Sequence, residues 1–240
     1  MYNDSICSIL KRFNIHGFRA FAVGSCVYKL LLGEAPVSCT IVTSASAKQI
    51  KNLFKSAVSR SVNQYITISE LGIICYVFPI LSFESTSNKD LYIYLAASEF
   101  TCSAVALSHT GELVDFFGGE ADIKNGIISS ISNAFELFKK KPEKMLYAIR
   151  LAADSGFALS ENVKAAVRAC APLIKTIERD FVLSSLTSIL MSQHPDFIRI
   201  MHETLLLQYI LPQLDKCFGE PQKNKYHIYD VGEHIMHTLT

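Results

Sequence analysis

Apolar and polar positions along this chain follow two different periods, and the change falls near residue 119. In the first half, short stretches that alternate between apolar and polar residues predict β-strands. We expect these strands at residues 18–23, 38–43, 65–69, 73–80, 100–107 and 113–116. Stretches with apolar residues three or four positions apart predict helices at residues 5–13, 26–32 and 46–56. Residues 85–90 are polar and predict a loop.

Beyond Gly118 and Gly119, the apolar pattern has the helical period alone. It predicts helices at residues 134–141, 142–155, 161–170, from 172, 180–192 and 195–211. Strands first and helices afterwards indicate an α+β fold class. We therefore expect a head with a sheet of about five strands at residues 1–119. An all-α neck should follow at residues 120–192, and a helical body should start at residues 193–240.

Composition narrows the classes of protein that fit this chain. Half of the residues are apolar, which is enough for a packed core, and the formal net charge is only +1. The longest nearly apolar stretch, residues 71–81, is too short to cross a bilayer, and the N-terminus lacks a signal-peptide pattern. The seven cysteines are dispersed and form no CxxC pair, so we expect free thiols and no zinc site. We expect a cytoplasmic protein without a membrane partner.

One stretch of the chain departs from this neutral balance. Residues 122–175 contain nine basic and five acidic side chains, which leaves a local charge of +4. Five of the basic residues lie close together, namely Lys139, Lys140, Lys141, Lys144 and Arg150. Such a cluster is either the solvated face of helices or a surface that binds phosphate groups of RNA.

Six stretches, the first two of which form one motif, give five motifs in an order that resembles one known family. Residues 23–33 read VGSCVYKLLLG, where the family has a Gly-Gly or Gly-Ser turn, Val-Arg-Asp and Leu-Leu-Gly, and residues 38–45 read SCTIVTSA, where it has Asp-x-Asp and a Thr-Ser-Ala-like run. Residues 99–104 read EFTCSA and residues 113–119 read LVDFFGG, close to the family's Asp-Phe-Thr and Asp-Pro-Phe-Gly-Gly motifs. Residues 139–152 read KKKPEKMLYAIRLA, and residues 226–234 read YHIYDVGEH. Together they resemble the tRNA nucleotidyltransferase (CCA-adding enzyme) and poly(A) polymerase family, in its class II bacterial form.

The resemblance implies a nucleotidyltransferase-like head with a mixed sheet, and it implies phosphoryl transfer with Mg²⁺ as cofactor. Two aspartates at i and i+2 on a strand point to the same face, where two Mg²⁺ ions bind. Ser38 and Thr40 stand at these two positions, and no carboxylate stands near Cys75, where a further acidic group is implied. Hydroxyl groups are neutral, and losing one electrostatic stabiliser costs on the order of 3 kcal/mol. We therefore expect no catalytic residue to be intact and no cofactor to bind.

The resemblance also implies which residues would read the incoming base. In the family, an aspartate and an arginine of the neck hydrogen-bond the base, and Lys141 and Lys144 stand in their place. A later family arginine falls on Phe181. Gly24 and Ser25 could still hold a phosphate on backbone N–H groups, although a plain strand-to-helix turn explains them equally well. Candidate residues for nucleotide or RNA binding are Gly24, Ser25, Lys140, Lys141, Lys144 and Arg150.

The last stretch places His227, Asp230, His234 and His237 along one helical stripe. Such a stripe could recruit a metal ion, but no His-Asp dipeptide follows it before Thr240. We expect no metal site here, and we expect the chain to be truncated before an HD-type domain.

Three hypotheses follow for the function. The first is a nucleotidyltransferase-like protein without nucleotide-adding activity, which binds tRNA, another RNA or a protein partner through its neck and body. The second is an active RNA 3′-end nucleotidyltransferase with unusual metal ligands. The third is a purely structural subunit.

Overall fold

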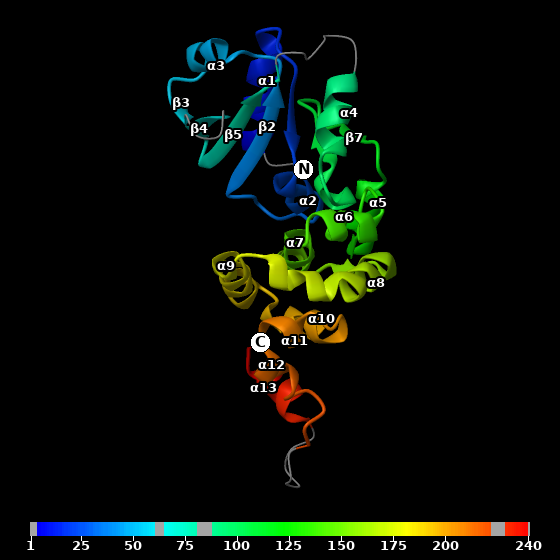
Figure 1. The fold of residues 1–240 in the computed structure, drawn as a ribbon. Coiled ribbons are helices and arrows are strands. Elements are labelled where there is room, and N and C mark those ends of the chain that lie inside the picture. The colour runs from blue at the N-terminus through cyan, green and yellow to red at the C-terminus, as the bar shows by residue number, and fades with distance from the viewer. Residues whose placement is uncertain (1–3, 61–64, 81–87, 222–228, 240) are drawn as a thin grey trace. The chain divides into compact units, whose positions relative to one another are not determined.

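A computed structural model describes residues 4–60, 65–80, 88–221 and 229–239 of the chain. The chain divides into two compact units, residues 1–125 (unit 1) and residues 126–240 (unit 2). Unit 1 contains a sheet with helices, and unit 2 is mainly helical (Figure 1). The expected α+β class is confirmed. The boundaries expected at residues 119 and 192 stay predictions.

The sheet of unit 1 is mixed and, within the described residues, has seven strands rather than the expected five or so. Their order across the sheet is β3-β4-β5-β2-β1-β6-β7. β2 and β5 pair in parallel, and the other neighbours pair antiparallel. The strands are β1 (Ala20–Val23), β2 (Ser38–Thr43), β3 (Val58–Arg60), β4 (Tyr65–Glu70), β5 (Ile73–Pro79), β6 (Val105–Leu107) and β7 (Leu113–Asp115).

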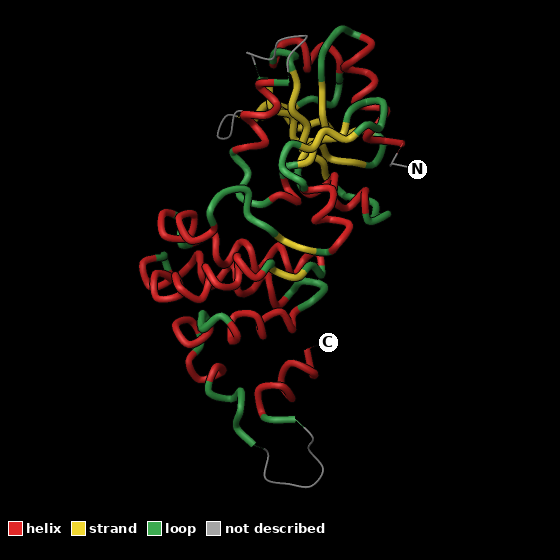
Figure 2. The backbone as a smooth tube through the Cα atoms, turned by 90° about the vertical axis from the view of Figure 1, so that its right-hand side faces the viewer, coloured by secondary structure: helices red, strands yellow, loops and turns green. Residues whose placement is uncertain are grey.

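Helices of unit 1 cover the sheet and its ends (Figures 1 and 2). They are α1 (Asp4–Ile15), α2 (Ser25–Leu31), α3 (Ala47–Leu53), α4 (Lys89–Ala96), α5 (Gly119–Asn125) and a 3₁₀ turn, η1 (Thr101–Ser103). The apolar stripe of α1 is fully buried, as its spacing predicts, through Ile6, Ile9, Leu10 and Phe13. Arg12 of α1 also pairs with Glu70 of β4, at 3.0 Å between Nη1 and Oε2.

Two expectations for unit 1 are corrected by the structure, and three of its elements were not expected. The strand expected at residues 100–107 is split, because η1 occupies its first half and only β6 pairs in the sheet. The strand β3 and the helices α4 and α5 were not expected. The loop expected at residues 85–90 ends inside α4, and its residues 85–87 lie outside the described part of the chain.

Unit 2 is built from pairs of helices, with α6 packed on α8 and α7 packed on α9. Its larger helices are α6 (Ala134–Lys140), α7 (Glu143–Ser155), α8 (Glu161–Cys170), α9 (Arg179–Leu190) and α13 (Val231–Leu239). Shorter elements are η2 (Ala171–Thr176), η3 (Pro195–Phe197), α10 (Ile198–Glu203), α11 (Leu207–Ile210) and α12 (Pro212–Asp215). The expectation that only helices follow residue 119 is wrong in one detail, because β8 (Ile127–Ile128) and β9 (Ala158–Leu159) form a short parallel pair.

Two features of unit 2 show how its sequence sets the helix ends. α7 ends at Gly156, whose φ of 73° lies in the left-handed region that glycine tolerates. The single helix expected at residues 195–211 is broken into η3, α10 and α11. The break follows α10, where Leu205 has a φ of 61° and therefore cannot continue a right-handed helix. No described helix is long and apolar enough to cross a membrane.

Candidate nucleotide site and basic neck surface

The turn between β1 and α2 lies beside the first residues of β2. Val23, the last residue of β1, pairs with Thr40 of β2. Gly24 follows with a φ of 77°, and a Cβ atom built on it would meet no atom within 4 Å. Its carbonyl accepts a hydrogen bond from the N–H of Val27 at 3.0 Å, so the turn leads directly into α2. Backbone conformation alone therefore accounts for glycine here, and the role of Gly24 and Ser25 in phosphate binding stays a prediction.

Ser38 and Thr40 occupy one face of β2, as the strand period predicts. Both are partly exposed, whereas Cys39 and Ile41 between and beyond them are buried on the opposite face. The spacing in the sequence therefore gave the correct face for the two positions.

The neighbouring strand β5 adds no acidic group to this face. Its parallel register places Ile74 beside Ser38 and Tyr76 beside Thr40. Cys75, near which the sequence implied a further acidic position, is fully buried opposite Cys39. The residue that completes the face next to Ser38 is therefore Ile74, and neither β1, β2 nor β5 contains Asp or Glu.

Aromatic side chains continue this face across β4 and β5. The ring of Tyr65 contacts the rings of Tyr76 and Phe78, with centroids 5.4 Å and 5.5 Å apart. Among the described residues, no group of three or more His, Cys, Asp or Glu side chains is placed to hold a metal ion. The donors that Mg²⁺ prefers, which are carboxylate oxygens, are therefore missing from the residues of this face.

The retained LVDFFGG motif forms a turn that is held by one carboxylate. Asp115 accepts hydrogen bonds from the backbone N–H groups of Phe117, Gly119 and Glu120, at 3.0, 3.1 and 2.9 Å. Gly119 is packed so closely that a Cβ atom built on it would lie 2.2 Å from the carbonyl oxygen of Thr101. The motif therefore has a clear structural role in the start of α5.

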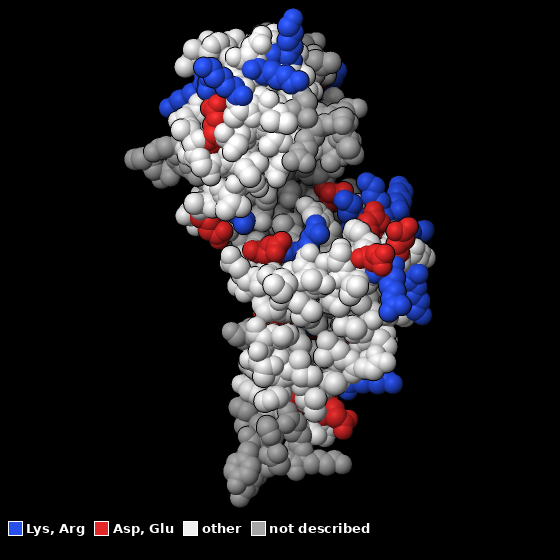
Figure 3. All heavy atoms as spheres, turned by 90° about the vertical axis from the view of Figure 1, so that its left-hand side faces the viewer, with Lys and Arg blue, Asp and Glu red and all other residues white. Residues whose placement is uncertain are grey.

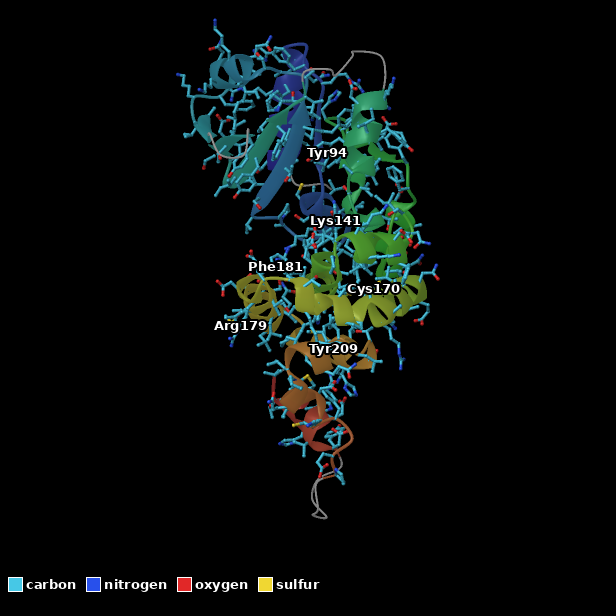
Figure 4. The ribbon with its side chains drawn as sticks, viewed as in Figure 1. Tyr94, Lys141, Cys170, Arg179, Phe181 and Tyr209 are labelled. Atoms are coloured by element: carbon cyan, nitrogen blue, oxygen red, sulfur yellow. The ribbon has the colours of Figure 1, made fainter. Side chains whose placement is uncertain are left out.

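The basic neck surface, as we name it, consists of Lys139, Lys140, Lys141, Lys144 and Arg150. The first three are exposed at the end of α6, and Lys144 and Arg150 are partly exposed on α7. Figure 4 labels Lys141, which lies between α6 and α7, and Phe181 on α9. On the face that Figure 3 presents, acidic side chains are interspersed among the basic ones. The structure thus places the predicted lysines and arginine on two consecutive helices of unit 2.

Sequence reasoning missed Tyr147 within this surface. Its ring contacts two cations of α7, with Lys144 Nζ 5.1 Å and Arg150 Cζ 5.2 Å from the ring centroid. Such distances are typical of cation–π contacts. The signal was present in the sequence, because Tyr147 stands where the resembling motif has an arginine and lies three residues from each cation.

Within the C-terminal stripe of His227, Asp230, His234 and His237, the carboxylate of Asp230 caps the start of α13. Asp230 accepts hydrogen bonds from the N–H groups of Glu233 and Gly219, at 2.7 Å and 2.8 Å. The bond from Glu233 contributes most to lowering the pKa of Asp230, because it stabilises the charged carboxylate. The rings of His237 and Tyr229 contact each other in a tilted arrangement, with centroids 4.2 Å apart. His227 lies outside the described residues.

Comparison with solved structures defines the class of fold. The Bacillus stearothermophilus CCA-adding enzyme in complex with CTP superposes with a TM-score of 0.73 at 24% identity, covering 89% of this chain and 55% of that chain. The Thermotoga maritima CCA-adding enzyme complexed with tRNA superposes with a TM-score of 0.71 at 20% identity, covering 88% and 54%. The sheet and its helical extension therefore have the nucleotidyltransferase fold.

Comparison of sequences finds relatives among the tRNA nucleotidyltransferases. The CC-adding tRNA nucleotidyltransferase of Halalkalibacterium halodurans is 28% identical over 204 residues, which cover 85% of this chain and 53% of that protein. The multifunctional CCA protein of Neisseria gonorrhoeae is 31% identical over 165 residues, which cover 66% and 39%. Residues 156–218 match a family model described as the probable RNA and SrmB-binding site of polymerase A. Over most of its length the chain is similar to tRNA nucleotidyltransferases (CCA-adding enzymes), and it spans about half the length of the curated relatives it matches.

Proposed function

We propose that this chain is a tRNA nucleotidyltransferase-like protein that adds no nucleotides and that binds RNA through its helical unit. The observation that carries the first part is the uncharged face of β2 and β5, where Ser38, Thr40 and Ile74 lie side by side. The basic neck surface and the match of residues 156–218 to an RNA-binding family model support the second part.

Absence of catalysis follows from the charge that phosphoryl transfer requires. The reaction places negative charge on the attacking oxygen and on the triphosphate, and anionic ligands must hold the metal ions that neutralise it. Ser38 and Thr40 offer neutral hydroxyl groups, and Ile74 offers no polar atom. The residues present therefore do not fit a Mg²⁺ pair, and we expect none to bind at this face.

Lysine side chains on the neck surface are suited to phosphate rather than to a base edge. Lysine carries donors only and is a flexible point charge, so Lys141 and Lys144 cannot reproduce the paired hydrogen bonds of an aspartate and an arginine. Exposed cations still attract the RNA backbone and release counterions when they bind it. RNA binding should therefore be indifferent to base identity and should weaken steeply as salt concentration rises.

The binding test compares two triple variants with the same loss of charge. Changing Lys140, Lys141 and Lys144 together to alanine should weaken tRNA binding and flatten the slope of log K against log salt by up to about 3. The matched control changes Lys48, Lys51 and Lys55, which are exposed on and after α3 of unit 1. Fluorescence anisotropy with a labelled tRNA transcript, from low to physiological salt, measures both slopes.

The outcomes separate the hypotheses about the helical unit. A slope that changes in the neck variant but not in the control supports RNA binding by unit 2. If the neck variant binds tRNA as the parent does at every salt concentration, its lysines form a solvated face and the chain is better explained as a structural subunit.

The catalytic test uses a tRNA that lacks its 3′ end, with Mg²⁺ and labelled CTP or ATP. We expect no incorporation above background from the parent chain. The double variant Ser38→Asp, Thr40→Asp should stay at background too. Ile74 still stands beside Ser38 where a further acidic group is implied, and Lys141 and Lys144 still stand in place of the aspartate and arginine that read the base. Incorporation by the parent that disappears in Ser38→Ala would contradict the proposal.

A further inference from the structure

Three cysteine side chains meet inside unit 1, directly beneath the face that carries Ser38 and Thr40. Cys26 lies in the first turn of α2, Cys39 lies on β2, and Cys75 lies opposite Cys39 on β5. All three are buried, with exposures of 1%, 2% and 0%. They come from three elements of the chain, so the fold alone brings them together.

The closest pair is Cys26 and Cys39, whose sulfur atoms lie 2.9 Å apart. A disulfide bond has a sulfur–sulfur distance of about 2.05 Å, so the two atoms need to approach by less than about 1 Å. The thiol of Cys26 also donates to the carbonyl oxygen of Val23 at 3.4 Å, which orients it within the turn. The pair is therefore held close to bonding distance by the packing of α2 on β2.

The pKa values of the two thiols are shifted in opposite directions, lowered for Cys26 and raised for Cys39. The hydrogen bond with Cys39 is the main cause that lowers the pKa of Cys26, against the opposing effect of burial. The pKa of Cys39 is raised, chiefly by its hydrogen bond with Cys26 and then by one with Cys75. A buried cysteine outside the cluster behaves differently, because burial raises the pKa of Cys102 to about 11. Cys26 is therefore the member of the pair with the larger thiolate fraction.

We propose that Cys26 and Cys39 form a reversible disulfide when the protein meets a hydroperoxide, tying the Gly24-Ser25 turn to β2. The sulfur of Cys26 attacks one peroxide oxygen, which breaks the O–O bond, gives a sulfenic acid and releases the other oxygen as water or alcohol. The sulfur of Cys39 then attacks the sulfur of Cys26, the S–O bond breaks, and the hydroxyl leaves as water with the thiol proton. Two thiols lose two electrons, and the peroxide gains them.

Position and burial give the disulfide two measurable properties. Access of the peroxide requires the first turn of α2 to open, so the reaction should be slower than oxidation of the more exposed Cys7 and Cys217. Once formed, the bond closes the loop from residue 26 to residue 39 and restricts the unfolded chain. The oxidised protein should therefore unfold at a higher urea concentration than the reduced protein.

The test uses a Cys7→Ser, Cys217→Ser background, which removes the two more exposed thiols. After peroxide treatment and alkylation under denaturing conditions, trypsin places Cys26 in residues 20–29 and Cys39 in residues 30–48, and Cys75 falls in a third peptide. We expect these first two peptides to be joined, with the mass of two hydrogens lost, and to separate after dithiothreitol. Neither Cys39→Ser nor Cys39→Ala should give the joined peptide.

Cys102 is the matched control, since it is equally buried in the same unit and should stay alkylated. The proposal is overturned if Cys26 and Cys39 remain alkylated while peroxide oxidises Cys7 and Cys217 of the parent. A Cys26 sulfinic acid without the linkage overturns it as well, and so does a linkage from Cys39 to Cys75 alone. Because the assay contains no RNA, its result is independent of the proposed binding function.

Discussion

Replacement of Asp115 by alanine should destabilise unit 1 far more than a typical change at a partly exposed position. The carboxylate accepts three backbone N–H groups, from Phe117, Gly119 and Glu120, and it is the acceptor that starts α5. Hydrogen bonds to a charged acceptor contribute roughly 1.5–3 kcal/mol each, although partial exposure lets water replace some of them. We expect the free energy of unfolding to fall by about 2–4 kcal/mol in Asp115→Ala.

The variant Asp115→Asn provides an internal calibration. Its amide oxygen can keep the two bonds that Oδ1 accepts, from Phe117 and Gly119, whereas its NH₂ group cannot accept from Glu120 as Oδ2 does. The loss should therefore be roughly half of that in the alanine variant.

Urea unfolding followed by circular dichroism measures the change, and hydrogen exchange on peptides from each unit locates it. Protection should fall in residues 116–125 and stay unchanged in unit 2. A loss below about 0.5 kcal/mol in Asp115→Ala, or equal losses in the two variants, would refute the proposed role of the carboxylate.

Two further predictions concern glycine packing and a helix cap. Gly119→Ala should lower the thermal unfolding midpoint strongly, because its Cβ would lie 2.2 Å from the carbonyl oxygen of Thr101 and the backbone must shift; a midpoint within two or so degrees of the parent's contradicts this. Asp230→Ala should fray α13 by about 1 kcal/mol at neutral pH, measured by hydrogen exchange of residues 231–239. Because the pKa of Asp230 is lowered from 3.8 in the folded protein, the parent should keep this stabilisation above that pH and lose it as the pH falls below it; protection that is unchanged in acid would count against the cap.

Most strands and helices could be predicted from the sequence because each has its own apolar period. Residues 38–43 and 73–80 were expected as strands, and β2 and β5 lie within those ranges. The split strand at residues 100–107 shows the limit of the method. Phe100 and Cys102 alternate with polar residues as in a strand, but Thr101 turns to donate to Asp122 of α5 at 2.6 Å, and η1 forms instead. That partner lies 21 residues away, so no local pattern contains it.

Some features of the candidate site follow from local spacing in the sequence, and others depend on contacts between distant residues. Ser38 and Thr40 share a face because they belong to one strand, and their spacing alone predicts it. The residue beside Ser38 depends on the register between β2 and β5, and the register selects Ile74 rather than Cys75. Tyr147 lies three residues from Lys144 and from Arg150 on one helix, so its contacts with both follow from spacing alone.

The proposed function, in which no nucleotide is added, accounts for the distribution of carboxylates within unit 1. Asp115 stands at the position of an aspartate in the family motif, and it accepts hydrogen bonds from three backbone amides whether or not a reaction takes place. Ser38 and Thr40 lie beside Ile74 and Tyr76 in the pairing of β2 with β5, which the backbone holds together. A carboxylate at either position would therefore serve only to hold a metal ion. Two adjacent aspartates without a metal would repel each other across this uncharged face, at a cost to folding. Neutral residues are therefore the more stable choice wherever the metal is no longer used, and the fold can persist without the chemistry.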